Sequence, residues 1–240
     1  MRIDPEECGG CLECIDFCPM GCILERDVGV AIDEDDCVEC GVCLRAGVCP
    51  TDALYMPEES MRWPRVIRAQ FSDPGVQHPG MNQGGRGTEE MKTNDVTGRF
   101  RRGEYGMALE FGRPGIGTRL TEIEKVLKVL AAMDVELERN NPVFLLVEDP
   151  RTGRLKPEVL QEKVLSAILE FKIREAQLEN VVRALQPVLA EIDTVVSWGL
   201  ATRFAEDGTL PVRQRLEALG VSARPNAKIN MGMGRPIVER

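Results

Sequence analysis

The chain contains few of the residues from which common active sites are built. It has one histidine, His78, and no cysteine after position 49, which leaves no Ser-His-Asp set, no Cys-His pair in the C-terminal half and no later metal motif. No apolar run approaches the roughly 18 residues that a membrane helix needs, and we find no charged leader with an apolar core. The residues after position 57 lack the strong basic excess of a nucleic-acid binder. We therefore expect a soluble, cytoplasmic protein without membrane or nucleic-acid partners.

The acidic residues are unevenly distributed along the chain. Residues 1–57 contain thirteen acidic residues and three arginines, a net charge of −10, whereas the remaining residues carry a net charge of +1. An acidic surface favours solubility, and it also attracts a partner protein with a basic face. We expect the N-terminal segment to dock against a basic partner.

All nine cysteines belong to an internal repeat. "IDPEECGGCLEC" (3–14) matches "IDEDDCVECGVC" (32–43) at an offset of 29 residues, and "CPMGCI" (18–23) matches "CPTDAL" (49–54) at an offset of 31. Each half therefore reads C-x-x-C-x-x-C followed by a more distant C-P. Closely spaced cysteines in a chain without an export signal are typical of metal ligands rather than disulfides.

Over residues 1 to about 57, this double motif resembles the bacterial-type ferredoxins that carry two [4Fe–4S] clusters. A cubane cluster needs four thiolates, and in this family the C-P cysteine of each half ligates the cluster of the other half. The resemblance therefore implies two [4Fe–4S] clusters. The implied ligands are Cys8, Cys11, Cys14 and Cys49 for cluster one, and Cys37, Cys40, Cys43 and Cys18 for cluster two.

Three details qualify this pattern. The second half has five residues, "LRAGV", before its last cysteine where the first half has three, so we expect a local bulge near Cys49. The middle cysteines Cys11 and Cys40 are present, which favours four-iron over three-iron clusters. Cys22 stands where the other half has Ala53, and we interpret it as a small packing residue; a reactive thiol or substitute ligand is the alternative.

Zinc sites also use closely spaced cysteines, but the duplicated triplets favour cubanes.

Residues 58–104 are rich in Gly, Pro and Arg and show no sustained periodicity, which predicts an irregular linker or wrapping arm. Within it, "RWPRVIRAQF" (62–71) combines bulky apolar side chains with three arginines. This composition suits packing on an acidic or aromatic surface, either of this chain's own N-terminal domain or of a partner. We expect His78, also in this segment, to be a solvated loop residue.

Residues 105–240 predict an α+β, sandwich-like domain in the order β-α-β-α-β-α-β, with one face of an open sheet covered by helices. A split β-α-β arrangement is one form of this architecture. Neither a phosphate-binding loop nor a G-x-G-x-x-G motif is present. The expected strands are 105–111, 142–148, 194–204 and 227–234. Three helices are expected: the first begins at Thr121 with a capping box to Glu124, the second runs from 157 to 186, and the third ends at Gly220.

Three functions are compatible with this organisation. The favoured one is a non-catalytic electron-transfer subunit of a larger cytoplasmic, anaerobic oxidoreductase, which makes the chain part of a hetero-oligomer. The second is an iron–sulfur reductase whose C-terminal domain binds a substrate or flavin. The third is a redox sensor. The first is favoured because no residue set outside the cysteine segment indicates an organic reaction.

Overall fold

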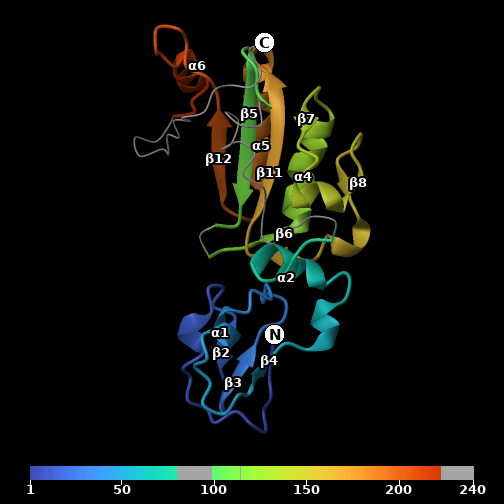
Figure 1. Cartoon of the computed structure of the whole chain (residues 1–240), viewed down its shortest axis with the longest axis vertical. Helices are drawn as coiled ribbons and strands as arrows, with labels where there is room; N and C mark the ends of the chain where they lie inside the picture. The colour runs from blue at the N-terminus through green and yellow to red at the C-terminus, as the bar shows by residue number, and fades with distance from the viewer. Residues whose placement is uncertain (80–98, 114, 223–240) are drawn as a thin grey trace.

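The computed structural model describes residues 1–79, 99–113 and 115–222 (Figure 1). Their buried apolar side chains form two separate clusters, one within residues 1–54 and one formed by side chains between residues 67 and 212. We call residues 1–57 the N-terminal unit and the described part of residues 104–222 the C-terminal unit. In the described part of the chain, no helix has the length and apolar character needed to cross a bilayer.

The two halves of the N-terminal unit are interlocked through their strands. Strand β1 (Arg2–Ile3) pairs antiparallel with β4 (Leu54–Tyr55), and β2 (Ile23–Glu25) pairs antiparallel with β3 (Val30–Ile32). Each pair joins the opening strand of one repeat to the closing strand of the other. The remaining elements are a 3-10 turn, η1 (Ile15–Phe17), and a single helical turn, α1 (Val42–Arg45).

The apolar core of the N-terminal unit is small. Seven buried residues form it, and four of them are cysteines: Met1, Cys14, Cys22, Ile23, Cys37, Cys43 and Leu54. A segment of this size gains little from burying so few aliphatic side chains, and in small domains of this kind a bound metal commonly contributes to the folding free energy. The unit is therefore organised around its thiols.

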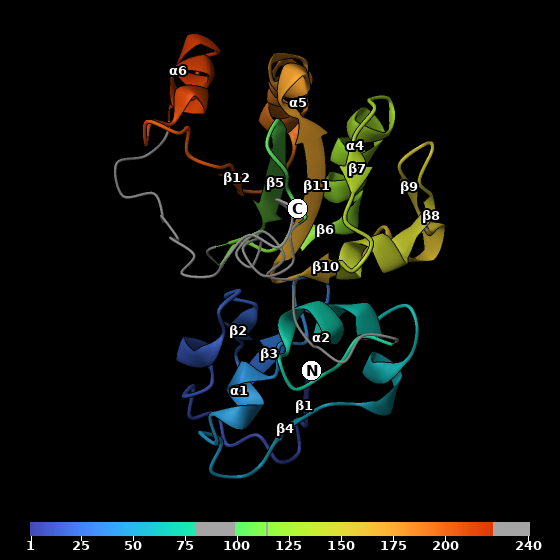
Figure 2. The same cartoon turned by 45° about the horizontal axis from the view of Figure 1, so that its top comes forward.

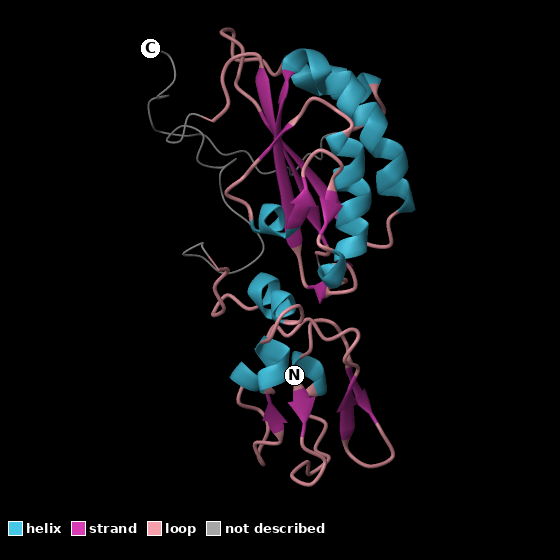
Figure 3. Ribbon diagram, turned by 90° about the vertical axis from the view of Figure 1, so that its right-hand side faces the viewer, coloured by secondary structure: helices cyan, strands magenta, loops and turns pink. Residues whose placement is uncertain are grey.

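The C-terminal unit is built on a four-stranded antiparallel sheet in the order β12-β5-β11-β7. Helices α4 and α5 contact each other and lie on one face of the sheet (Figure 3). Helix α4 lies in the connection from β5 to β7, which are separated in the sheet by β11, and α5 connects β11 to β12, which are separated by β5. This is the split β-α-β arrangement. The bounds are β5 Glu104–Phe111, α4 Leu120–Ala131, β7 Glu136–Leu137, β11 Ala167–Arg174, α5 Leu178–Glu191 and β12 Val196–Ala201.

Alternation along the central strands decides which face meets the helices. On β5, Tyr105, Met107, Leu109 and Phe111 are buried in the core, and their partners on β11 are Ile173, Phe171, Leu169 and Ala167. A strand with side chains alternating between two faces can cover a helical layer with one of them and leave polar residues on the other. The predicted strand at 105–111 and its core-facing residues are confirmed.

The predicted helix over 157–186 is wrong, because α-helix begins only at Leu178 in this segment. It contains the turn η5 (Pro157–Val159), β10 (Lys163–Val164), β11, the turn η6 (Glu175–Gln177) and only then the start of α5. The sequence "AILEFKIR" of β11 alternates apolar and polar side chains with a period of two, which suits a central strand. Helix α5 then continues past Pro187 to Glu191.

The predicted β-α-β-α-β-α-β order is therefore incorrect, and the segment at 142–148 departs from it too. Residues Pro142–Leu146 form a 3-10 turn, η4, because Pro142 occupies its first turn and the Asn141 side chain accepts a hydrogen bond from the Val143 N–H. A short hairpin follows, of β8 (Val147–Asp149) and β9 (Arg154–Leu155). The strand expected at 227–234 lies outside the described residues.

The start of the first long helix of the C-terminal unit also differs from the expectation. Helix α4 begins at Leu120 after a second small pair, β6 (Thr118–Arg119) with β10, and no side chain caps it. The predicted capping box does not form, because Thr121 lies inside the helix and its N–H donates to the Leu160 carbonyl, while the Glu124 carboxylate accepts from the Leu155 N–H. The short helix expected before Gly220 is present as α6 (Pro211–Ala218).

The segment after residue 57 contains ordered structure that the sequence analysis did not predict. It forms a 3-10 turn, η2 (Glu58–Met61), and the helix α2 (Val66–Ser72), which lies between the two units (Figure 2). Ile67 and Phe71 of α2 belong to the core of the C-terminal unit. The prediction of a solvated His78 is wrong: it is 3% exposed and meets the Phe71 ring edge-on.

Candidate metal centres

The two cysteine triplets share one backbone conformation. Gly10 and Leu12 in the first triplet have φ of 68° and 65°, and the equivalent Glu39 and Gly41 in the second have φ of 52° and 65°. Left-handed backbone is costly for Leu and Glu, and such strain persists where a function requires it. Alternation between right- and left-handed residues turns successive N–H groups toward one side, forming the concavities that hold anions and iron–sulfur clusters.

Both C-P segments contain a main-chain hydrogen bond to the cysteine sulfur. The Cys22 N–H donates to Cys18 Sγ at 3.3 Å, and the Ala53 N–H donates to Cys49 Sγ at the same distance. The left-handed residue that permits each turn is Gly21 in the first half and Asp52 in the second. A hydrogen bond to sulfur stabilises the thiolate, which is the form that binds metal.

The electrostatic neighbours of the buried thiols divide the eight predicted ligands into two groups. Burial raises the pKa of Cys14, and the neighbouring thiols Cys11, Cys49 and Cys8 raise it further. Burial likewise raises the pKa of Cys43 to about 11, and its neighbours in this effect are Cys40, Cys37 and Cys18. Each group therefore contains one triplet and the C-P cysteine of the other half. We call them site one (Cys8, Cys11, Cys14, Cys49) and site two (Cys37, Cys40, Cys43, Cys18).

Cys22 lies beside site two. Its Sγ is 3.4 Å from Cys18 Sγ, and it is buried in the small core. Hydrogen bonding with Cys22 lowers the pKa of Cys18 to about 5 and the pKa of Cys37 to about 7, and these same bonds raise the pKa of Cys22. Cys22 is buried, as expected of a small packing residue, and it is also a hydrogen-bond partner of two predicted ligands.

The two sites differ in their exposure to solvent. At site one Cys11 is exposed, Cys8 and Cys49 are half-buried, and only Cys14 is buried. At site two the three residues of the triplet, Cys37, Cys40 and Cys43, are all buried, and Cys18 is half-buried. A partner protein can therefore approach site one more closely than site two.

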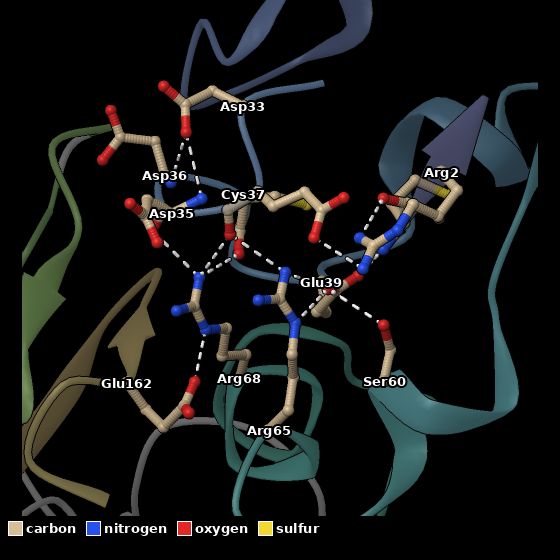
Figure 4. Close-up of polar contacts among 12 residues, drawn as sticks. Arg2, Asp33, Asp35, Asp36, Cys37, Glu39, Ser60, Arg65, Arg68 and Glu162 are labelled. Atoms are coloured by element: carbon tan, nitrogen blue, oxygen red, sulfur yellow. Dashed lines mark hydrogen bonds and ion pairs between the residues drawn. The ribbon is translucent and has the colours of Figure 1, made fainter. Parts of the chain in front are cut away.

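A buried carboxylate lies inside the second triplet. Glu39 is 0% exposed and pairs with the amino group of Met1, and Arg65 of the segment after the N-terminal unit donates to its Oε1 through two nitrogens at 2.9 and 2.7 Å (Figure 4). Burial alone would raise the pKa of Glu39, but these two cations hold it below its ordinary value. Ser60 Oγ also donates to this carboxylate, at 3.3 Å.

Two further arginines donate to main-chain carbonyls of site two. Arg45 reaches the Cys40 carbonyl at 2.7 Å and pairs with Asp73, and Arg68 reaches the Cys37 carbonyl at 2.8 Å. Of the alternatives left open for the arginines of 62–71, packing on this chain's own N-terminal unit holds for Arg65, which pairs with the Glu39 carboxylate, and for Arg68, which donates to main-chain carbonyls. Their individual partners were not foreseeable, because they depend on how α2 lies against the N-terminal unit.

The residues present suit an iron–sulfur cluster at each site. Cysteine thiolates are the ligands that hold such clusters, and loops that alternate right- and left-handed residues generally turn their N–H groups toward a bound anion or cluster. In the described part of the chain, no three His, Cys, Asp or Glu side chains lie close enough to share a single metal ion. The thiols with raised pKa must lose their protons on binding, so loading is expected to release protons.

The C-terminal unit contains a polar cavity beside β7 and β11. It measures about 300 Å³, and its lining includes Arg99, Glu138 and Lys172. These charges are engaged with one another or with neighbours: Arg99 pairs with Glu138 at 2.6 Å, and Lys172 pairs with Glu136 at 3.1 Å. This arrangement stabilises the sheet edge and does not identify a flavin or substrate.

Comparison with known proteins places the similarity in the N-terminal unit. Residues 1–24 match the 4Fe-4S binding domain family. A ferredoxin from Methanothermococcus thermolithotrophicus is 44% identical over 61 residues, which are 24% of this chain and 98% of that protein. A ferredoxin from Rickettsia felis is 39% identical over 62 residues, 24% of this chain but only 54% of that protein.

A further relative, "Pyruvate synthase subunit PorD" from Methanothermobacter marburgensis, is 44% identical over 57 residues, 24% of this chain and 64% of that protein. The chain thus spans less than two thirds of this protein and about half of the Rickettsia ferredoxin. No solved structure matches the chain significantly.

Proposed function

The chain belongs to the ferredoxin family through its first sixty residues, and from this premise we propose that it relays single electrons through two [4Fe–4S] clusters. The observation that carries the proposal is the duplicated backbone of the two triplets, in which residues as unsuited as Leu12 and Glu39 adopt left-handed conformations. When bound, a [4Fe–4S] cluster takes up and releases one electron. The chain contributes by holding it and tuning its charge.

The proposed ligands follow the two groups of thiols. Cys8, Cys11, Cys14 and Cys49 hold the cluster of site one, and Cys37, Cys40, Cys43 and Cys18 hold the cluster of site two. Because each site takes its fourth ligand from the opposite half, loss of either half removes a ligand from both sites. The N–H groups of Cys22 and Ala53 donate to the sulfurs of Cys18 and Cys49 and stabilise negative charge there.

Site one is the proposed point of electron exchange with a partner. Its Cys11 is exposed, and the neighbouring acidic residues Glu6, Glu7 and Glu13 are exposed as well. This combination favours a donor or acceptor whose docking face is basic, and the rate of association then falls as salt screens the attraction.

We further propose that the chain works as the iron–sulfur subunit of a larger cytoplasmic, anaerobic oxidoreductase. The name of one relative, a pyruvate synthase subunit, supports a role within a larger enzyme. The C-terminal unit then fixes the N-terminal unit to that enzyme, because α2 carries apolar side chains into the C-terminal core and arginines into the N-terminal unit.

Anaerobic purification followed by iron and sulfide analysis tests the proposal. We expect eight irons and eight sulfides per chain, and two distinct paramagnetic signals on reduction. Cys49→Ala and Cys14→Ala are expected to alter the same signal, whereas Cys18→Ala and Cys43→Ala alter the other. Bound zinc, or four irons per chain, contradicts the two-cluster proposal. A co-purifying flavin would support the reductase alternative instead.

A further inference from the structure

The guanidinium of Arg68 is buried between the two units. Arg68 is 4% exposed, and its Nη1 donates to three main-chain carbonyls of the N-terminal unit, at 2.9, 2.9 and 2.8 Å: those of Glu34, Asp35 and Cys37. Its Nε donates to the Glu162 carboxylate of the C-terminal unit at 2.5 Å (Figure 4). A full positive charge is thus fixed in a desolvated position and bonded to the main chain of a site-two ligand.

Two arginines are bonded to the main chain of site two, alongside the buried Glu39 carboxylate that Arg65 and the Met1 amino group bind. Arg45 donates to the carbonyl of Cys40 at site two, and the equivalent position of the first repeat holds Asp16. Arg68 lies beyond the repeat and approaches the second triplet only. The carboxylates near Arg68 and the second triplet are Glu162, which pairs with Arg68, Asp36, which Lys163 binds at 2.5 Å, and Glu39, which Arg65 and the Met1 amino group bind.

A cation near a cluster stabilises its reduced form, because reduction adds a negative charge. At an effective dielectric constant of about 20, a unit charge about 10 Å away changes such an equilibrium by about tenfold. Burial strengthens the effect because little water is available to screen it. A carboxylate paired with the cation reduces it.

We propose that Arg68 raises the reduction potential of the site-two cluster above that of site one, with Glu162 as the counter-charge that limits the effect. This inference rests on the proposed function. Its consequence is directional: an electron that enters at the exposed site one moves to the shielded site two, next to the C-terminal unit. Arg68 therefore acts through its charge, by changing which cluster holds the electron, and it touches no substrate.

Potentiometric titration of the holoprotein, followed by electron paramagnetic resonance, tests the inference with three variants. In Arg68→Gln we expect the potential of one cluster to fall, by about a tenfold change in its ratio of reduced to oxidised form, which is 59 mV for one electron. The affected signal is the one that Cys43→Ala alters. Arg68→Lys keeps the charge and is expected to restore most of the potential.

Glu162→Gln is the discriminating variant, because it leaves Arg68 held by three carbonyls but removes the counter-charge. We expect the same cluster to shift in the positive direction, opposite to Arg68→Gln. A purely structural role for the pair would shift both variants the same way and would overturn the inference, as would unchanged potentials in both with eight irons retained. If Arg68→Gln does not load its clusters, the inference is tested by Glu162→Gln alone: its potential is expected to lie above that of the wild type.

The two proposals fail in different ways. Fewer than eight irons, or a single signal, in the wild-type protein contradicts the proposed function. Eight irons and two signals with equal potentials, insensitive to Glu162→Gln, contradict the role of Arg68 alone.

Discussion

Replacing Phe71 by alanine tests whether α2 is part of the C-terminal core. The side chain is 2% exposed and belongs to the same apolar cluster as Leu127 and Phe171. Its ring also meets the His78 ring at 4.7 Å between centroids and an angle of 87°. Truncating a buried phenylalanine removes its transfer free energy and leaves a cavity, which together cost about 3–5 kcal/mol.

Urea unfolding under anaerobic conditions measures this cost. Trp198 packs against the C-terminal core and reports its unfolding, and a Trp63→Phe background removes the second tryptophan signal. With a urea slope of about 2 kcal/mol per M, the predicted loss lowers the midpoint by about 1.5–2.5 M. The visible absorbance of the clusters, followed in parallel, is expected to persist in the folded variant, because Phe71 does not belong to the core of the N-terminal unit.

Phe204→Ala is the matched control, since that ring is 46% exposed. We expect it to change the free energy of unfolding by no more than about 0.5 kcal/mol. The reasoning is refuted if Phe71→Ala lowers the midpoint no more than this control does. It is also refuted if the variant loses its clusters while the Trp198 transition is unchanged, because Phe71 would then support the N-terminal unit.

Three further predictions concern other parts of the chain. Burial and a hydrogen bond to Glu175 raise the pKa of Tyr105 to about 12 from an ordinary value of 10.0, so its contribution to stability is present below pH 10 and is lost as pH rises toward 12. Unfolding free energies measured between pH 9 and 12 should therefore fall more steeply in wild type than in Tyr105→Phe; equal slopes contradict this. Gly153 has φ of 70°, and a Cβ there would lie 2.4 Å from the main chain of Leu127, so Gly153→Ala is expected to cost about 2–5 kcal/mol in thermal or urea unfolding. Cys22→Ala should keep all its iron, because the residue packs beside site two without ligating it; loss of four irons would make it a ligand.

The N-terminal unit could be predicted from the sequence in considerable detail. The spacing of its cysteines lies within short loops, the duplication indicated the repeat, and the resemblance to two-cluster ferredoxins implied the crossing of the C-P residues. The left-handed conformations of Leu12 and Glu39 were not predictable from residue type, because neither residue favours them. They become understandable only as positions equivalent to Gly41 and Gly10 in the other repeat.

The C-terminal unit was less predictable, because its periodicities are ambiguous. "AILEFKIR" alternates apolar and polar side chains over only a few residues inside a segment of helix-forming residues, and the pairing of β11 with β5 along its whole length decides in favour of a strand. The run at 142–146 has strand-like composition, but the local cap at Asn141 and Pro142 favours a turn. Helix α2 has seven residues and gains its stability from contacts with both units.

The sequence by itself determined where the metal-binding unit lies, that it is duplicated, and which thiols stand at ligand spacing, since these features depend on neighbouring residues in short loops. Only the tertiary structure decided which site is shielded and which charges surround it. Arg68 and Glu162 are 94 positions apart, and Arg68 meets the Cys37 carbonyl 31 positions away. Burial and electrostatic environment are properties of packing between distant segments, and no local pattern specifies them.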